Sequence, residues 1–299
     1  MAKYLTPAVT PLMPDGTVDF ESCKRLYEHL IKGGVDGILI FGSIGEFFAF
    51  DVPTKKKVIS LAAEVIGGRV ELIVGTTSMV YDEITELSDY ALNVGADAVM
   101  VIPPYYFHFT DESVYEYYSS LARHIKGRLY LYNFPERTGY GISAEVVKKL
   151  AQNYKNIVGI KDTISGVDHT RELIKAVKPI RPDFIIYSGF DDNFAHNALC
   201  GGDGCIAGLS NIYPQLTSAW AAAFNAGDMR KVKHIQGAID KLMDIYAVGK
   251  PFVPFIKQVL ADKGIISYPT ASKPMPAATA EQINKLKMIT EEFENAQNS

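Results

Sequence analysis

This sequence has few cysteines, no long apolar run and no large excess of either charge. Its three cysteines, Cys23, Cys200 and Cys205, are too few and too scattered for a disulfide framework or a zinc site. No segment approaches the roughly 18 consecutive apolar residues that a membrane-spanning helix needs. The first residues also lack the apolar run of a secretory signal peptide. We therefore expect a cytoplasmic protein that has no membrane partner.

The balance of charge and polarity excludes further classes. Against 34 Asp and Glu residues stand 30 Lys and Arg, so the formal net charge is −4. Without a basic excess to neutralise a phosphate backbone, we expect no nucleic-acid partner. Hydrophobic residues make up 47% and charged residues 21%, values typical of a globular domain rather than of a disordered chain or a coiled coil. The six histidines show no paired spacing, so we expect no metal site.

What the sequence does contain is a regular alternation of short apolar runs and amphipathic segments. The apolar runs start roughly 20–35 residues apart, which is the length of one strand–helix unit. They are apolar throughout rather than alternating, as expected for parallel strands that are covered on both faces. The predicted strands are Leu5–Thr10, Gly37–Phe41, Glu71–Gly75, Ala98–Ile102, Leu129–Asn133, Ile157–Lys161, Phe184–Ser188 and Gly204–Ala207.

The segments between these runs predict helices that end near glycine or begin after a capping residue. Eight strands that alternate with eight helices indicate an α/β fold, a (β/α)8 TIM barrel. An open doubly wound sheet is the alternative, but the sequence has no dinucleotide-binding glycine pattern. We assign residues 1–226 to the barrel and residues 227–299 to a C-terminal helical extension. The predicted helices are Phe20–Lys32, Pro53–Ile66, Tyr81–Val94, Asp111–Ile125, Ala144–Tyr154, Asp168–Val177, Phe190–Leu199, Pro214–Ala226, Met229–Val248, Phe252–Lys263 and Ala280–Asn295.

Chemistry in such a barrel takes place at the carboxyl ends of the strands, and that rule selects a few residues. Lys161 ends the apolar run Ile157–Ile160, where partial desolvation favours an uncharged amine. A neutral amine can attack a carbonyl carbon and form a Schiff base. Tyr132, near the end of the fifth run, can relay protons beside that amine. Each residue also has a simpler interpretation, as a lysine that reaches solvent and as a tyrosine that packs in the core.

Two loops that follow predicted strands also carry candidate residues. The segment Gly42–Glu46 combines small residues with the hydroxyl of Ser43, and backbone N–H groups in such a turn suit a carboxylate ligand. An ordinary turn between a strand and a helix is the alternative. The segment Pro103–Phe107 is an aromatic loop, a composition often found at subunit contacts.

Together these segments resemble the dihydrodipicolinate synthase / N-acetylneuraminate lyase superfamily of Schiff-base lyases over nearly the whole chain. The matching segments follow the same order as in that superfamily. They are the Gly42–Glu46 turn, Pro104-Tyr105-Tyr106, Tyr132–Gly139, Gly159–Asp162 and Gly201–Gly204. The resemblance implies a (β/α)8 barrel, a homotetramer built as a dimer of dimers, and a small-molecule 2-oxo acid as substrate.

The resemblance also implies roles for individual residues. Lys161 is then the Schiff-base lysine, and Tyr132 is the proton donor and acceptor. Ser43 takes the place of the family's relay hydroxyl, and Tyr106 takes that of a tyrosine contributed by a neighbouring subunit. The carboxylate of the 2-oxo acid is expected on the turn formed by Ser43 and Ile44. Because the covalent imine on Lys161 supplies the chemistry, we expect no cofactor.

Several residues differ between members of this superfamily and therefore bear on the identity of the substrate. Bacterial 2-keto-3-deoxygluconate aldolases tolerate a non-hydroxyl residue after the serine of the turn, as Ile44 is here. Asp191 and Asp192 resemble an acidic pair that binds sugar hydroxyls in sialic acid lyases, and an acidic first turn of a helix is the alternative. Gly208 stands where those lyases carry a sugar-binding serine, which counts against sialic acid. The remaining expected substrate contacts are Gly45, Gly189 and Ile206.

We therefore favour reversible aldol cleavage of a 2-keto-3-deoxy sugar acid to pyruvate and an aldehyde. Condensation of pyruvate with aspartate semialdehyde, as in a 4-hydroxy-tetrahydrodipicolinate synthase, is the alternative. Arg137 supports it, because it matches the arginine that holds the semialdehyde carboxylate in those enzymes. A related oxo-acid dehydratase or deaminase is a third reading. A metal-dependent aldolase and a non-catalytic binding protein stay open as interpretations from other classes.

Overall fold

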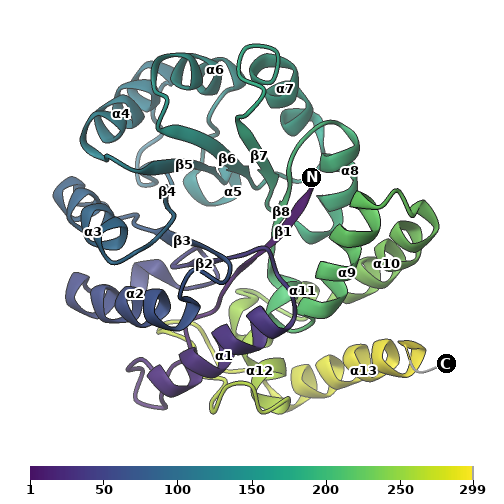
Figure 1. Ribbon diagram of the computed structural model, residues 1–299. Coiled ribbons are helices and arrows are strands. Elements are labelled where there is room, and N and C mark those ends of the chain that lie inside the picture. The colour runs from purple at the N-terminus through teal and green to yellow at the C-terminus, as the bar shows by residue number, and fades with distance from the viewer. Residues whose placement is uncertain (298–299) are drawn as a thin grey trace.

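Eight parallel strands form a closed barrel that is surrounded by helices (Figure 1). The computed structural model describes residues 1–297. Each strand pairs with the next one along the chain, and β1 closes the barrel by pairing with β8. The predicted (β/α)8 barrel is thereby confirmed. The strands are β1 (Lys3–Pro7), β2 (Gly37–Ile40), β3 (Glu71–Gly75), β4 (Ala98–Val101), β5 (Arg128–Asn133), β6 (Ile157–Asp162), β7 (Ile185–Ser188) and β8 (Gly204–Ile206).

The helices form an outer layer and a C-terminal extension (Figure 1). The main barrel helices are α1 (Phe20–Lys32), α2 (Val52–Ile66), α3 (Tyr81–Asn93), α4 (Asp111–His124), α6 (Ala144–Asn153), α7 (Asp168–Val177), α8 (Phe194–Leu199) and α9 (Pro214–Asn225). Short helical turns that the sequence did not predict as separate elements are η1 (Phe47–Ala49), α5 (Pro135–Thr138), η2 (Asp191–Asn193) and η3 (Gly208–Asn211). The extension contains α10 (Met229–Leu242), α11 (Asp244–Ala247), α12 (Val253–Asp262) and α13 (Ala280–Gln297).

Capping side chains define where several of the barrel helices begin. Asp19, Asp51, Thr110 and Ser143 each accept a hydrogen bond from the backbone N–H three residues later. Such a bond satisfies one of the free N–H groups of the first turn and is worth about 1 kcal/mol. These caps fix the residue at which each loop from a strand ends and the next helix begins. The candidate site lies on loops of this kind.

Carboxylates at the amino edge of the barrel hold neighbouring strands in register. Asp36, Asp97 and Asp203 each precede a strand and accept a hydrogen bond, 2.7–2.8 Å long, from a backbone N–H of the adjacent strand. In barrels of this kind the amino edge serves stability and the carboxyl edge carries the chemistry. The role of these three carboxylates is thus explained by the fold.

Closure of the barrel depends on a glycine at the junction of the last strand with the first. Gly204 of β8 pairs with Lys3 of β1, and its φ is +122°. A Cβ atom at this position would lie 1.9 Å from the carbonyl oxygen of Lys3. Only a residue without a side chain lets the two backbones come this close.

Several predicted boundaries differ from the structure by a residue or two, and two elements of the barrel differ by more. The first strand is Lys3–Pro7 rather than Leu5–Thr10, because its pairing with β8 begins at Lys3 and its pairing with β2 ends at Pro7. The helix predicted for Phe190–Leu199 begins only at Phe194. Phe190 has an extended backbone, and the three residues of η2 intervene.

The C-terminal extension packs against the barrel through α9 and η3. Helix α10 contacts α9, α12 contacts η3, and α13 contacts both α10 and α12. The single helix predicted for Met229–Val248 is interrupted at Met243, which separates α10 from α11. The division into residues 1–226 and 227–299 stays a prediction, and residues 298 and 299 lie outside the described part. No helix among residues 1–297 has the length and apolar character that a membrane crossing requires.

Candidate active site

Three of the four predicted catalytic side chains meet at the carboxyl edge of the barrel. Tyr132 and Lys161 lie opposite each other in the pairing of β5 with β6. The Lys161 Nζ lies 3.4 Å from the Tyr132 Oη, and it lies 4.6 Å from the centre of the Tyr132 ring. The Ser43 Oγ lies 3.3 Å from the same Tyr132 Oη. Lys161 is only 3% exposed and Tyr132 only 4%, so the amine is held beside a phenol with little competition from bulk water.

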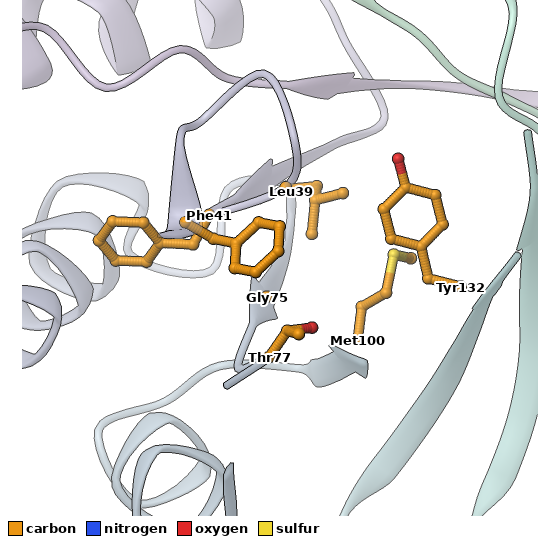
Figure 2. A pocket seen from close by; sticks show the side chains of 8 residues that line it. Leu39, Phe41, Gly75, Thr77, Met100 and Tyr132 are labelled. Atoms are coloured by element: carbon orange, nitrogen blue, oxygen red, sulfur yellow. The ribbon is translucent and has the colours of Figure 1, made fainter. Parts of the chain in front are cut away.

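A small apolar pocket supports the ring of Tyr132. Figure 2 shows the Tyr132 ring on one wall of this pocket and Phe41 on the opposite wall, with Leu39 and Met100 between them. The pocket lies on the β2, β3, β4 and β5 side of the barrel and is lined by Leu39, Phe41, Gly42, Phe47, Gly75, Thr77, Met100 and Tyr132. Nearly all of this lining is apolar. The phenol hydroxyl of Tyr132 therefore finds its polar partners in Ser43 and Lys161, as the distances above indicate.

The turn after β2 offers unused backbone donors next to these groups. Within residues 1–297, the N–H groups of Ser43, Ile44 and Gly45 donate no hydrogen bond. The turn is packed tightly, because a Cβ atom on Gly45 would lie 2.9 Å from the backbone nitrogen of Phe41. Free N–H groups that converge in a turn form a site for an anion such as a carboxylate. The arrangement can thus hold a 2-oxo acid by its carboxylate while its carbonyl carbon faces an amine.

Asp162, the residue after the candidate lysine, is the centre of a buried hydrogen-bond network. Asn133 Nδ2 donates to it at 2.7 Å, Thr170 Oγ1 at 2.7 Å and His169 Nδ1 at 2.9 Å. The other ring nitrogen of His169 donates to the carbonyl oxygen of Ile142 at 3.0 Å. Because both ring nitrogens face acceptors, the contacts favour the doubly protonated, cationic imidazole. The network holds the end of β6, from which the candidate lysine projects, and the sequence analysis did not identify it.

Replacing His169 by glutamine is expected to destabilise the protein more near pH 6 than near pH 9. Burial alone lowers the pKa of His169, but the hydrogen bond to Asp162 and its negative charge outweigh burial and raise the pKa above its usual value. The resulting stabilisation is fully present below the unfolded-state pKa of about 6.5 and is lost as pH rises through the folded-state pKa. We expect a loss of about 1–3 kcal/mol in the free energy of unfolding near pH 6, measured with denaturant.

The matched control for this prediction is His124→Gln. His124 lies on the surface of α4 and contacts the exposed Asp89 at 3.2 Å. Because exposed ion pairs contribute little, this variant should stay close to the wild-type protein at both pH values. A His169→Gln deficit that is constant with pH, or that grows toward high pH, would contradict the assignment.

The other predicted site residues lie at the rim of this edge or beneath it. Tyr106 is 81% exposed in the single chain, and its ring packs edge-on against Phe107. Arg137 is exposed on α5, and its guanidinium lies 5.3 Å from the centre of the Phe134 ring. Asp192 is exposed as well. Ile206 is fully buried at the end of β8, and Gly189 is packed so closely that a Cβ atom there would lie 1.9 Å from Thr163 Oγ1.

Asp191 requires a correction, because the protein itself occupies its carboxylate. Tyr4 Oη donates to Asp191 Oδ1 at 2.5 Å, Leu209 N–H donates to Oδ1 at 2.9 Å, and Tyr246 Oη donates to Oδ2 at 2.7 Å. Asp191 is 2% exposed, and burial raises its pKa above the usual value. A substrate hydroxyl therefore has no accessible oxygen of Asp191 to bind, and the acidic pair expected from the sequence is reduced to Asp192. The expectation failed because Tyr4 and Tyr246 come from β1 and α11, far from Asp191 in the sequence.

The described residues do not form a cluster of side chains suited to binding a metal ion. No group of three or more His, Cys, Asp or Glu side chains among residues 1–297 is arranged to hold a metal ion. The expectation that the enzyme needs neither a metal nor another cofactor stays a prediction.

Comparison with known proteins gives a consistent result over nearly the whole chain. Residues 1–293 match the model of the dihydrodipicolinate synthetase family. The chain is 33% identical over 285 residues to "Probable 2-dehydro-3-deoxy-D-pentonate aldolase YjhH" of Escherichia coli (strain K12), with 95% of each chain covered. It is 36% identical over 243 residues to the 4-hydroxy-tetrahydrodipicolinate synthase of Kosmotoga olearia, with 81% of this chain and 82% of that one covered.

Solved structures show the same similarity. The crystal structure of YagE, a prophage protein from E. coli K12 in the dihydrodipicolinic acid synthase family that was solved in complex with pyruvate, aligns with a TM-score of 0.95. The sequence identity is 31%, and the alignment covers 98% of this chain and 99% of that one. The barrel, the site at its carboxyl edge and these matches lead to one conclusion: the chain belongs to the dihydrodipicolinate synthetase family of pyruvate-dependent lyases and aldolases.

Proposed function

We propose that the protein is a lyase that forms a Schiff base between Lys161 and a 2-oxo acid. The observation that carries this proposal is the buried Lys161 Nζ, held 3.4 Å from Tyr132 Oη at the carboxyl edge of the barrel. A buried amine beside a proton-transfer group is the arrangement that covalent carbonyl chemistry needs. The free N–H groups of the turn from Ser43 to Gly45 add a binding site for the substrate carboxylate.

In the cleavage direction, we propose that these groups act in the order in which the bonds change. The Lys161 amine attacks C2 of the oxo acid, the Tyr132 phenol gives its proton to the carbinolamine hydroxyl, and loss of water leaves an iminium ion and a Tyr132 phenolate. Tyr132 accepts the proton of the C4 hydroxyl, the C3–C4 bond breaks to release an aldehyde, and its electrons move into the iminium to give an enamine. Protonation of the enamine at C3 and hydrolysis of the imine then release pyruvate and regenerate the amine. Ser43, 3.3 Å from the phenol, can pass the proton on.

We further propose that the substrate is a 2-keto-3-deoxy sugar acid, which is cleaved reversibly to pyruvate and an aldehyde. Ile44 supports this choice, because the turn offers only one side-chain hydroxyl, that of Ser43. The similarity to the E. coli protein named as a 2-dehydro-3-deoxy-D-pentonate aldolase supports it as well. Condensation of pyruvate with aspartate semialdehyde is the second candidate. Arg137 favours that reaction, because its exposed guanidinium at the rim can bind a second carboxylate.

We also propose that the working enzyme is a homotetramer in which Tyr106 completes the site of a neighbouring subunit. Several large apolar side chains lie exposed on loops and helices that follow β2, β3 and β4, and a concentration of this kind is typical of a subunit interface. They are Phe48, Met79, Val80, Tyr81, Tyr105, Tyr106 and Phe107. Because Tyr106 is 81% exposed in the single chain, it is free to reach another subunit.

A substrate panel tests the choice of reaction. The rates of cleavage of 2-keto-3-deoxy pentonic and hexonic acids are measured by release of pyruvate, and compared as kcat/KM with condensation of pyruvate and aspartate semialdehyde. We expect the cleavage reactions to be faster by at least about tenfold. Faster condensation would contradict the proposed substrate and would leave the Schiff-base mechanism in place.

Arg137→Ala separates the two reactions further. We expect this variant to change the kcat/KM of sugar acid cleavage by less than about threefold. The Arg137 guanidinium lies beside the Phe134 ring, and no hydrogen bond or ion pair within residues 1–297 joins it to the carboxylate-binding turn. Condensation activity, where it is measurable, should fall by about tenfold or more, since a charged hydrogen bond to the second carboxylate is lost. Arg123→Ala, at an exposed arginine on α4, is the control. A collapse of both reactions would show that Arg137 serves the shared 2-oxo acid.

A further inference from the structure

A fully buried ion pair connects the carboxylate-binding turn to the C-terminal extension. Glu46 ends the turn after β2, and its Oε1 is paired with the Nζ of Lys257 on α12. Both side chains are 0% exposed. Glu46 Oε2 also accepts a hydrogen bond from the backbone N–H of Ser272 at 2.6 Å, and Lys257 Nζ donates to the carbonyl oxygen of Thr270 at 2.9 Å. The other members of this cluster, which are Lys257, Thr270 and Ser272, all belong to the C-terminal extension.

The turn that this cluster contacts has an unfavourable backbone conformation at both of its ends. Phe41 and Glu46, the residues on either side of Gly42–Gly45, have φ values of +54° and +57°. Among the described residues they are the only ones other than glycine with positive φ. Each left-handed residue of this type costs about 1–3 kcal/mol and persists only where its surroundings enforce it. At one end of the turn, the contacts of the Glu46 carboxylate hold this residue in its left-handed conformation.

Burial of this pair is also unfavourable, so attachment of the extension does not explain it. Removing two charges from water costs several kcal/mol per ion, and apolar side chains of similar size would often serve stability equally well. The extension already has apolar contacts with the barrel and surface ion pairs of its own, such as Lys263 with Glu294. A strained turn and a buried charge pair therefore coincide at a loop in which three consecutive N–H groups, those of Ser43, Ile44 and Gly45, lack acceptors.

We propose that Lys257 is a positioning residue for the 2-oxo acid, although it lies outside the barrel and touches no substrate. It fixes the Glu46 carboxylate, Glu46 fixes the left-handed end of the turn, and the turn aims the N–H groups of Ser43, Ile44 and Gly45 at the substrate carboxylate. The C-terminal extension is thereby a functional part of the substrate site. The inference rests on the proposed function, because it takes the turn to be where the carboxylate binds.

The test compares Lys257→Met with the double variant Glu46→Gln/Lys257→Met. The single variant leaves Glu46 buried without its cation, so it is expected to lose stability. The double variant removes both charges and should fold, as judged by circular dichroism and thermal unfolding. Affinity is measured by borohydride trapping of Lys161 at increasing concentrations of pyruvate, and in parallel with methyl pyruvate, which keeps the 2-oxo group but has no carboxylate charge. We expect the double variant to bind pyruvate about tenfold or more weakly, and methyl pyruvate within about twofold of the wild-type protein.

Lys263→Met is the matched control, because it removes a lysine ion pair at the end of the same helix but away from the turn. Its affinity for pyruvate should be that of the wild-type protein. A folded double variant with wild-type affinity for pyruvate would overturn the proposal, and so would an equal loss for both ligands, which would indicate general damage near Lys161. Failure of the wild-type protein to form any adduct would instead contradict the proposed function, so the two failures are distinguishable.

Discussion

Replacing Lys161 by methionine is expected to reduce turnover by roughly three orders of magnitude or more, because the covalent intermediate can no longer form. Methionine keeps most of the length and volume of the side chain and removes the charged amine of a residue that is only 3% exposed. The variant should therefore fold at least as stably as the wild-type protein. Pyruvate release from the best substrate of the panel measures the loss, and thermal unfolding checks the fold.

Tyr132→Phe is the matched control for this prediction. Phenylalanine preserves the ring, which is stacked on Phe134 with a centroid distance of 6.1 Å, and removes only the hydroxyl between Lys161 and Ser43. Turnover should fall by about 10²–10⁴, the usual contribution of a proton-transfer group, while the amine can still form an imine. A Lys161→Met enzyme that keeps more than about one hundredth of the wild-type rate would exclude this lysine as the nucleophile.

Gly204→Ala is expected to cause the largest loss of stability among single glycine replacements considered for the barrel. Two costs combine there, because φ is +122° and the new Cβ would lie 1.9 Å from the carbonyl oxygen of Lys3. A left-handed alanine costs about 1–2 kcal/mol, and forcing backbone apart adds about 1–3 kcal/mol. We therefore expect the free energy of unfolding to fall by about 2–5 kcal/mol, or the barrel to fail to close, as measured by denaturant unfolding.

Gly95→Ala separates the two costs. Gly95 has a φ of +108°, but a Cβ atom there would have no other atom within 4 Å. Its loss should be that of the backbone conformation alone, about 1–2 kcal/mol. Equal losses in the two variants would show that the contact between β8 and β1 does not limit barrel closure.

Local patterns in the sequence were sufficient to predict the order of elements and several boundaries. The strand Glu71–Gly75 and the helix Phe20–Lys32 begin and end as predicted, because an apolar run bounded by glycine and an amphipathic period are local properties. The same rule placed Tyr132 and Lys161 at strand ends, and the parallel barrel then brought them to one edge. The helical turn Pro135–Thr138 was missed because it lies inside a loop and is too short to show a period.

Contacts between distant parts of the chain account for what the sequence did not predict. Asp191 shows in the sequence only an acidic helix start, whereas its partners Tyr4 and Tyr246 come from β1 and α11. The burial of Glu46 likewise depends on Lys257, which belongs to the extension. Neither pairing has a characteristic spacing, so only the folded chain reveals them.

Covalent trapping of pyruvate is the most direct test of the mechanism. The protein is treated with sodium borohydride in the presence of pyruvate, digested and analysed by mass spectrometry. We predict a stable adduct of one reduced pyruvyl group on Lys161, absent from the Lys161→Met variant. An unmodified protein, or an adduct on another buried lysine such as Lys55, would contradict the assignment of Lys161 as the Schiff-base residue.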